Sequence, residues 1–230
     1  MKKFLKFLFI KLPLALIALS VIMVLILKWV PVLVTPIMIS RSIEYRDDPD
    51  FHTSKKWCRL QDISPELMKA VITSEDNLFC EHRGFDRKAI EQAIQENREG
   101  KRMRGGSTIS QQTAKNVFTL HGRTMWRKAV ESWFTVLIEI FWGKERIMEV
   151  YLNVAEMGKG VYGAQAAAQA FYHKDAASLT RLEASTLAAC LPSPLSRNAA
   201  KPSRYVSSRA ATISRMIPNL NYPDWIERKD

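Results

Sequence analysis

The longest apolar stretch of the chain lies at its N-terminus. Residues 12–27 carry no charge, and the apolar run begins as early as Phe7 if Lys11 is included in it. A bilayer needs about 20 consecutive apolar residues, which residues 7–27 supply when the amine of Lys11 reaches the interface. A cleaved signal peptide is the alternative, but its apolar region spans about 7–15 residues and ends at small residues. Because this chain stays apolar through Ile39, we predict a retained transmembrane anchor over residues 12–34. An anchor that starts near residue 7 is the alternative.

The charges around this stretch predict its orientation. Lysines at positions 2, 3, 6 and 11 precede the apolar residues. The positive-inside rule therefore places residues 1–11 in the cytoplasm and the rest of the chain on the other side of the membrane. Residues 29–40 are apolar but interrupted by prolines, which is typical of a segment in the outer interface rather than of a second span. We assign residues 35–62 to this interfacial segment and a polar linker.

Beyond residue 62, apolar positions recur at the spacing of amphipathic helices. Ser64 followed by Pro65 predicts a helix that has the serine as its N-cap and ends near Glu75. Thr180 and Glu183 predict a capping box for a helix over residues 181–191. The other predicted helices cover residues 87–99, 124–142, 145–154, 163–172 and 203–217. No alternating strand pattern of useful length follows the anchor. The sequence therefore predicts a mainly α domain at residues 63–217 and a C-terminal tail at residues 218–230.

Length and composition limit the chain to one domain with a core and one membrane segment. It has 230 residues, of which 47% are hydrophobic, and this leaves no room for a second catalytic domain. The net charge of +11 suits nucleic acid, anionic lipid headgroups or a phosphorylated substrate. Because the sequence contains no zinc finger, aromatic RNA-binding signature or basic zipper, we expect no nucleic acid among its partners.

The cysteines and histidines show no metal-binding spacing. Cys58, Cys80 and Cys190 make an odd count, and the four histidines lie too far apart for a helical ligand pair. We expect the cysteines to be small buried residues, with a Cys58–Cys80 disulfide as the open alternative.

Residues 75–84, EDNLFCEHRG, combine two adjacent acids with an aromatic residue, a histidine and a glycine. Glu75 lies at the predicted C-terminal end of a helix, where the helix dipole and the charge of Asp76 are both expected to raise its pKa. A carboxylate tuned in this way can act as a general base. Two solvated acids that close a helix are the plainer interpretation. We expect His82 to shape the loop by hydrogen bonding rather than to carry a proton.

Residues 105–112, GGSTISQQ, form a second block, and Lys115 and Asn116 follow it closely. A Gly-Gly-Ser-Thr loop is commonly only a turn. It also lets backbone N–H groups and two hydroxyls approach phosphate or sugar oxygens, while Gln111 and Gln112 supply neutral amides suited to sugar hydroxyls. The complete block is much more specific than any of its parts.

A cluster of cations lies at the start of the helix predicted over residues 124–142. Arg123, Arg127 and Glu131 are spaced four apart and share a face if the helix extends back to Arg123, and Lys128 lies within a turn of Glu131. An ordinary surface ladder of ion pairs is the plainer interpretation. Several Arg and Lys side chains together can instead hold a diphosphate. The apolar side of the same helix is predicted to carry Val130, Trp133, Phe134, Leu137, Ile138 and Phe141.

Taken together, these three blocks resemble those of the family 51 peptidoglycan glycosyltransferases, and the length and single anchor resemble their monofunctional biosynthetic form. Two further blocks, at residues 144–153 and 182–192, extend the resemblance to about residues 64–202. The departures are small: Ser110 stands where the family usually has Thr, and Thr113 replaces a more usual apolar residue. The resemblance implies a lysozyme-like helical transglycosylase domain with one N-terminal transmembrane helix.

The family reaction implied by the resemblance is the polymerisation of lipid II into glycan strands, which moenomycin inhibits. A hydroxyl of the acceptor sugar attacks the anomeric carbon of a donor chain, and lipid diphosphate leaves. The resemblance implies Glu75 as the base and Glu131 as a second essential carboxylate that either orients the cations or holds a divalent ion, Mg or Mn. No organic cofactor is expected.

The residues implied to bind substrate are Asp76, Ser107, Thr108, Gln111, Gln112, Lys115, Asn116, Arg123, Arg127 and Lys128. Those implied to support the site are Phe79, His82, Gly84, Gly105, Gly106, Glu149 and Asn153.

The same resemblance implies a single-pass protein of the inner membrane with a cytoplasmic N-terminus and a periplasmic catalytic domain. The implied partners are lipid II, the lipid-linked glycan chain, the membrane, and proteins of cell division or cell-wall synthesis.

Two other classes of protein stay open as alternatives. A membrane-anchored lytic enzyme would share the helical fold and a catalytic glutamate, but it would have no use for cations around a leaving diphosphate. A non-catalytic scaffold would keep degenerate motifs, whereas both acids and all the cations are intact here.

Overall fold

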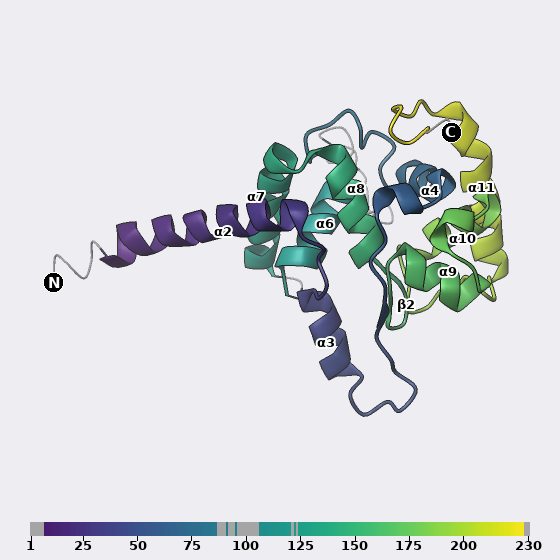
Figure 1. Ribbon diagram of the computed structural model, residues 1–230, viewed down its shortest axis with the longest axis horizontal. Helices are drawn as coiled ribbons and strands as arrows, with labels where there is room; N and C mark the ends of the chain where they lie inside the picture. The colour runs from purple at the N-terminus through teal and green to yellow at the C-terminus, as the bar shows by residue number, and fades with distance from the viewer. Residues whose placement is uncertain are drawn as a thin grey trace.

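The computed structural model describes residues 7–86, 91, 95, 106–120, 122 and 124–227. One helix, α2 (Leu12–Trp29), projects from a helical body that contains most of the other described residues (Figure 1). A short π-helical turn, η1 (Phe7–Lys11), precedes it. By length and composition, Phe9–Trp29 is the one helix among the described residues that can cross a membrane, with a mean hydropathy of 2.7. The predicted N-terminal apolar helix is therefore present.

The described part of the body consists mainly of helices, which confirms the prediction of a mainly α chain. Its described helices are α3 (Pro36–Glu44), α4 (Pro65–Glu75), α6 (Ile109–Phe118), α7 (Met125–Phe141), α8 (Gly143–Val154), α9 (Ala164–Tyr172), α10 (Arg181–Cys190) and α11 (Arg204–Met216). Short 3-10 turns lie at η2 (Leu60–Asp62), η3 (Ala176–Ser178) and η4 (Ile217–Asn219). The helix predicted over residues 87–99 lies outside the described residues, apart from Glu91 and Gln95, which are helical.

A small sheet that the sequence analysis missed lies beside α9. Strand β3 (Val161–Tyr162) pairs in parallel with β1 (Ser54–Lys55) and antiparallel with β2 (Glu156–Gly158). The strand order is β1-β3-β2. Strands of two or three residues are too short to show an alternating pattern, because that signal needs about four residues or more.

The helix starts were predicted with mixed success. The capping box of Thr180 and Glu183 is present at the start of α10, as expected. The capping role of Ser64 is wrong, because its hydroxyl donates instead to the carbonyl of Leu179 at 2.8 Å. The proline-interrupted interfacial segment contains α3, which begins at Pro36 because proline fits the first turn of a helix.

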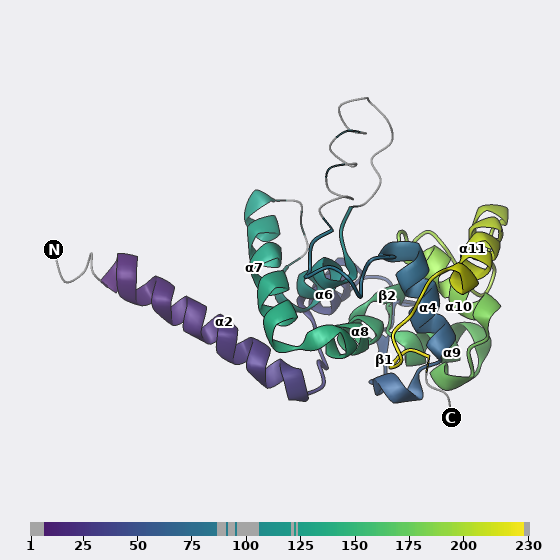
Figure 2. The ribbon, with the colours of Figure 1, turned by 90° about the horizontal axis from the view of Figure 1, so that it is seen from above.

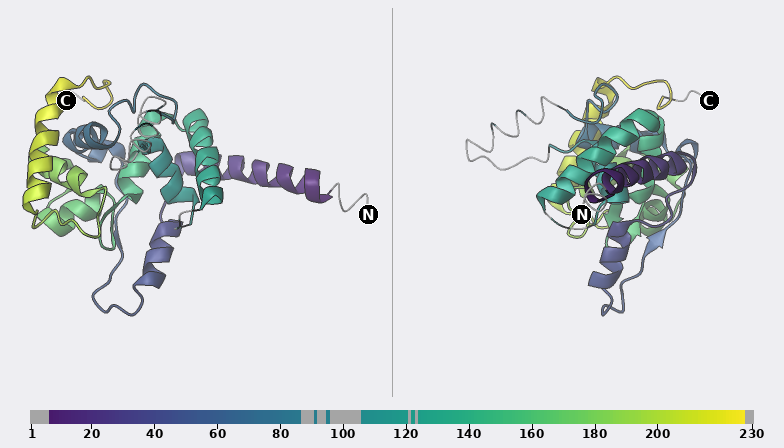
Figure 3. Two further views of the ribbon diagram at one scale, coloured as in Figure 1. Left: turned by 180° about the vertical axis from the view of Figure 1, so that it is seen from behind. Right: turned by 90° about the vertical axis from the view of Figure 1, so that its left-hand side faces the viewer.

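The core lies where α10 packs against α4 and α11, and where α6 packs against α7 and α8. Its largest fully buried side chains include those of Phe79, Leu67, Met68, Met148 and Tyr151. Seen from behind and from the side, α11 lies at the end of the body opposite α2 (Figure 3). The candidate site residues of α4, α6 and α7 therefore lie between these two ends.

Helix α7 packs beside the C-terminal part of α2 (Figure 2). The indole N–H of Trp133 donates to Ser20 Oγ at 3.1 Å, and that of Trp142 donates to the carbonyl of Val24 at 2.7 Å. Trp133 and Val130, on the apolar side predicted for this helix, are 40% and 41% exposed, and Trp133 contacts the anchor helix through its indole N–H. The buried side chains of α7 are Glu131, Phe134, Thr135, Leu137 and Ile138.

All three cysteines are free thiols. Cys190 is buried as predicted, but Cys58 is half-buried and Cys80 is exposed. The alternative of a Cys58–Cys80 disulfide is therefore not realised in this structure.

Candidate active site

The two adjacent acids lie at the C-terminal end of α4 and have separate environments. Glu75 is the last residue of α4, and Asp76 caps the helix, with its N–H bonded to the carbonyl of Ile72. Asp76 is 7% exposed, and its carboxylate accepts hydrogen bonds from His82 Nε2 and from the N–H of Ile109, each at 2.9 Å. Its carboxylate therefore joins the end of α4 to the start of α6.

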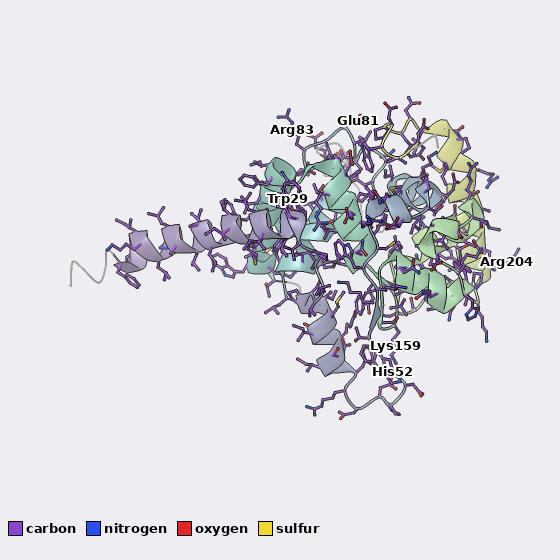
Figure 4. All side chains as sticks on the ribbon, in the orientation of Figure 1. Trp29, His52, Glu81, Arg83, Lys159 and Arg204 are labelled. Carbon is purple, nitrogen blue, oxygen red and sulfur yellow. The ribbon has the colours of Figure 1, made fainter. Side chains whose placement is uncertain are left out.

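The turn after α4 is held by residues predicted to support the site. Gly84 donates its N–H to His82 Nδ1 at 3.0 Å, so the ring proton lies on Nε2, which faces Asp76. The carbonyl of Gly84 accepts a hydrogen bond from the Thr108 hydroxyl at 2.7 Å, and Phe79 is completely buried. Side chains of the same block that point outward, Glu81 and Arg83, lie at one edge of the body (Figure 4).

Glu75 is half-buried and accepts a hydrogen bond from Gln112 Nε2 at 3.0 Å. Burial raises the pKa of Glu75, while the hydrogen bond from Gln112 and the charges of Arg209 and Arg197 act in the opposite direction. The predicted direction of the shift is thus correct, but its main cause is desolvation, and the charge of Asp76 contributes least among the causes. A carboxylate with a raised pKa is a stronger base once it is ionised.

A cavity of about 140 Å³ opens beside Glu75. The described residues that line it are Thr73, Ser74, Glu75, Asp76, Asn77, Asp86, Gly106, Ser107 and Thr108. Three residues of the predicted Gly-Gly-Ser-Thr loop, Gly106, Ser107 and Thr108, therefore meet the base at one opening, whereas Gly105 lies outside the described residues. A larger cavity of about 750 Å³, beside Trp57 at the end of α2, is lined by neither of the two acids.

The second block forms the start of α6. Thr108 is the N-cap, its hydroxyl accepts the N–H of Gln111 at 3.1 Å, and the side chain of Gln111 accepts the N–H of Thr108 at 3.0 Å. This reciprocal capping box satisfies two N–H groups that the helix itself leaves free. Both side chains are buried, so their contacts lie within the protein. Gln112, the next residue, reaches Glu75 instead.

The cation cluster surrounds a buried carboxylate at the start of α7. Glu131 is 2% exposed and accepts from Arg127 Nη1 at 2.7 Å and from Lys128 Nζ. Lys115 on α6 is exposed at the surface, and its pKa is lowered first by desolvation and then by the charge of Arg127, while the charge of Glu131 acts in the opposite direction. Asn116 is half-buried beside Lys115 on α6. Arg123 lies outside the described residues.

The family described as Transglycosylase matches residues 44–217. The chain belongs to this transglycosylase family. Three relatives cover nearly the whole chain, and each bears the name biosynthetic peptidoglycan transglycosylase. The protein of Caulobacter vibrioides is 48% identical over 93% of this chain and 91% of its own length. That of Pseudomonas entomophila is 48% identical over 92% of this chain and 90% of its own length. That of Pseudomonas aeruginosa is 47% identical over 92% of this chain and 91% of its own length.

Membership of the transglycosylase family confirms the predicted family and enzyme class, so the chain is a glycosyltransferase. All three blocks from which the resemblance was drawn lie within the matched residues. In this transglycosylase, therefore, the acids of α4 and the cations of α7 belong to one enzyme domain.

The fourth block of the transglycosylase lies on α8 and contacts the segment before α4. Glu149 pairs with Arg146 at 2.9 Å, and burial raises its pKa. The side-chain amide of Asn153 accepts the N–H of Cys58 at 2.8 Å and donates to the Cys58 carbonyl at 2.7 Å. Both residues therefore make their contacts within the protein, which is compatible with the predicted supporting roles.

The structure adds residues to the site that sequence reasoning missed. The phenol of Tyr151 donates to Gln112 at 3.2 Å, and the charges of Arg197 and Arg209 act on Glu75. Tyr151 belongs to the fourth block, but no spacing in the sequence indicates its contact with Gln112. Arg197 and Arg209 follow the last block and carry no spacing that could have indicated them. Their effect on Glu75 depends on how α11, which carries Arg209, and the connection after α10, which carries Arg197, pack against α4.

Two polar contacts of Glu139 link α6, α7 and α8. Glu139 of α7 accepts from the hydroxyl of Ser110 on α6 and pairs with Lys144 of α8 at 2.7 Å. The Lys144 amine also lies 4.6 Å from the centre of the Phe79 ring. These contacts fix α6 relative to α7, and hence Gln112 relative to the cations.

Among the described residues, no group of three or more His, Cys, Asp and Glu side chains is arranged to hold a metal ion. Glu131, the predicted alternative ligand, already has both carboxylate oxygens bonded to cations. The groups around it therefore fit the orienting role better than the metal-binding one.

Proposed function

We propose that this chain polymerises lipid II into the glycan strands of peptidoglycan. The oxygen of an acceptor sugar hydroxyl forms a bond to the anomeric carbon of the donor chain, while the bond from that carbon to the diphosphate oxygen breaks. The hydroxyl proton passes to Glu75, and the electron pair of the broken bond leaves with the lipid diphosphate. The reaction needs a base on one side of the anomeric carbon and cations on the other.

One observation carries this proposal: α6 connects the base to the cations. Gln112 and Lys115 are three residues apart, so they lie on one side of the helix. Gln112 bonds to Glu75 at 3.0 Å, while Lys115 lies in the field of Arg127 and Lys128. A lytic enzyme would need the carboxylate but would have no leaving diphosphate for the cations to hold.

Glu75 is the proposed base. Its raised pKa lets the ionised carboxylate hold the acceptor proton more strongly than an exposed glutamate does. The adjacent cavity gives the acceptor hydroxyl an approach past Ser107 and Gly106. Asp76 cannot share this role, because its carboxylate is occupied by His82 and Ile109.

The cations of α6 and α7 are proposed to hold the donor diphosphate, and Glu131 is proposed to orient them. Arg and Lys side chains bind phosphate oxygens through charge-assisted hydrogen bonds, which strengthen as negative charge develops on the leaving group. Glu131 fixes Arg127 and Lys128 from below the surface. Its occupied oxygens do not fit a divalent ion, and no proposed step needs an ion at Glu131.

Several residues that the resemblance assigns to substrate binding are better suited to support. Asp76, Thr108 and Gln111 are buried and make their contacts inside the protein. We propose that they hold the end of α4 against the start of α6. The proposed substrate contacts of the second block are then Ser107, Gln112, Lys115 and Asn116.

The proposed location is the inner membrane, crossed once by α2, with a cytoplasmic N-terminus and a periplasmic catalytic domain. The lysines before α2 support this orientation. Trp29 at the end of α2 is 79% exposed, and Trp126 on α7 is 84% exposed. Exposed tryptophans are typical of the membrane interface, where they would keep the site close to lipid-linked substrates. Proteins of cell division or cell-wall synthesis are the proposed protein partners.

The test is the polymerisation of lipid II by the purified full-length protein in detergent with a divalent cation. The proposal predicts a polymer that muramidase digests, and no release of soluble fragments from purified sacculi. Fragment release without polymer would identify a lytic enzyme. The absence of both activities, with no binding of moenomycin, would favour a scaffold.

The diphosphate role has its own matched pair of variants. Arg127→Gln is expected to lower kcat/KM for the donor by about 10²-fold, because a cation is lost where charge develops. Arg46→Gln, which removes an exposed arginine paired with Asp47, is expected to leave the rate unchanged.

A further inference from the structure

Three buried or half-buried side chains form a hydrogen-bonded chain that ends on Glu75. The phenol of Tyr151 on α8 donates to Gln112 Oε1 at 3.2 Å. Gln112 Nε2 on α6 then donates to Glu75 Oε2 on α4 at 3.0 Å. Tyr151 is 1% exposed, so its hydroxyl has no access to bulk water as an alternative partner.

The surroundings of Gln112 determine which way its amide points. The carbonyl of Ser107 lies 3.5 Å from Nε2, so two acceptors, Glu75 and Ser107, lie on the nitrogen side. Tyr151 lies on the oxygen side, and burial raises the pKa of its phenol well above the usual value, which keeps the hydroxyl protonated. If the amide rotated, its oxygen would face the Glu75 carboxylate, and two acceptors would repel each other.

We infer that Tyr151 is a positioning residue for the transglycosylase reaction, because its hydroxyl holds the Gln112 amide with Nε2 toward Glu75. The inference rests on the proposed role of Glu75 as the base. Tyr151 itself does not touch the substrate in this scheme. It acts through Gln112, which keeps the carboxylate oriented toward the acceptor hydroxyl.

The inference has a consequence for proton binding at Glu75. The groups around this carboxylate are Gln112 from α6, Arg209 from α11, Arg197 after α10, and the neighbouring Asp76, with Asp86 lining the same cavity. Donation from Gln112 lowers the pKa of Glu75 against the effect of burial. Without the Tyr151 hydroxyl the amide oxygen loses its donor, so the amide is held less firmly toward Glu75, and the pKa of Glu75 is expected to rise.

The test is the Tyr151→Phe variant of the full-length protein, compared with Tyr162→Phe. Both substitutions keep the ring and remove one hydroxyl from a fully buried tyrosine. The Tyr162 hydroxyl donates to Glu156 at 3.3 Å, within the small sheet, and has no contact with Gln112. The pair therefore separates loss of a buried hydroxyl from loss of the contact to Gln112.

Two readouts are measured. The acidic limb of the pH dependence of kcat is expected to move upward by about 0.5–1 pH unit in Tyr151→Phe, because the base must ionise at higher pH. The limb is expected to stay in place in Tyr162→Phe. The infrared carboxyl band of Glu75, assigned by its absence in Glu75→Gln, is expected to titrate at correspondingly higher pH in Tyr151→Phe.

A double-mutant cycle tests whether Tyr151 acts through Gln112. In a Gln112→Leu background, Tyr151→Phe is expected to cause no further shift of the infrared titration. An unshifted titration in Tyr151→Phe alone, or an equal shift in Tyr162→Phe, would overturn the inference. A shifted infrared titration with an unchanged pH–rate profile would support the positioning role and count against Glu75 as the base. The two proposals can therefore fail separately.

Discussion

The carboxylate of Glu131 and the guanidinium of Arg127 form a 2.7 Å ion pair across one turn of α7. Glu131 is almost completely buried, and Lys128 occupies its other oxygen. Removing one partner of such a buried pair leaves an uncompensated charge, so both cations depend on this single carboxylate for their position. In the proposed mechanism, Glu131 therefore acts through Arg127 and Lys128 and does not touch the reacting atoms.

Replacing Glu131 by glutamine is predicted to disorder the cations without changing a metal requirement. We expect kcat/KM for lipid II to fall by about 10²-fold, since stabilisation of the leaving diphosphate is weakened. The concentration of Mg²⁺ that gives half-maximal rate is expected to stay unchanged, because the proposed role of Glu131 needs no ion. Rates measured over a Mg²⁺ series check both statements, with the exposed Glu145→Gln on α8 as control. A large increase in the half-maximal Mg²⁺ concentration of the Glu131→Gln variant would instead indicate that Glu131 binds a metal ion.

Asp76→Asn is predicted to destabilise the domain. An asparagine side chain keeps one acceptor, but its NH₂ group must then face either the His82 ring N–H or the N–H of Ile109. The loss of a buried charge-assisted contact is expected to cost about 2–4 kcal/mol of unfolding free energy. Thermal unfolding in detergent measures this cost. The exposed Asp47→Asn is the control and is expected to change stability by less than about 0.5 kcal/mol.

Glu75→Gln is predicted to stabilise the protein at neutral pH. Burial raises the pKa of Glu75 above its unfolded value, so ionisation at neutral pH favours the unfolded chain. Glutamine removes this buried charge, and Tm should rise by about 2–4 °C for each kcal/mol gained. The difference should vanish below the unfolded glutamate pKa of about 4.3, where both states are protonated. Melting curves at neutral and acidic pH measure it, and a lower Tm for the variant at neutral pH would contradict the burial argument.

Gly84→Ala is predicted to be costly for two reasons. Gly84 has a φ of +88°, and an added Cβ would lie 2.9 Å from Thr135 Cγ2 and 3.0 Å from Glu139 Cγ. Gly143 has a comparable φ of +74°, but an added Cβ there would meet no atom within 4 Å. Gly143→Ala is therefore expected to cost about 1 kcal/mol and Gly84→Ala about 1–3 kcal/mol more. Equal losses of Tm in the two variants would show that the contacts with α7 are unimportant.

The parts of the fold that local chemistry determines were predicted well. Helix α7 begins after Thr124, and α10 begins after the capping box of Thr180 and Glu183. Both starts are predictable because the capping residues and the apolar spacing lie within one short stretch of sequence. The sequence predicts the direction of the Glu75 pKa shift from the helix dipole and the charge of Asp76, but the main cause, desolvation, depends on packing and is visible only in the structure.

The parts that depend on packing between distant segments were not predictable. The hydroxyl of Ser64 does not cap α4, because it donates a hydrogen bond to the carbonyl of Leu179, which is distant in sequence. The direction of the Asp76 carboxylate depends on where α6 begins, and the exposed side of α7 at Trp133 depends on the position of α2. Periodicity within one helix shows which residues share a face, but it does not show which neighbour that face will meet.

The most direct test of the account compares lipid II polymerisation by the wild-type protein, Glu75→Gln and Glu81→Gln. Glu81 lies in the same block but is exposed at the edge of the body (Figure 4), so its variant controls for the loss of one negative charge. The account predicts that Glu75→Gln lowers kcat by about 10²–10⁴-fold while still binding moenomycin, and that Glu81→Gln polymerises at the wild-type rate. Polymer formation by Glu75→Gln at the wild-type rate would contradict it.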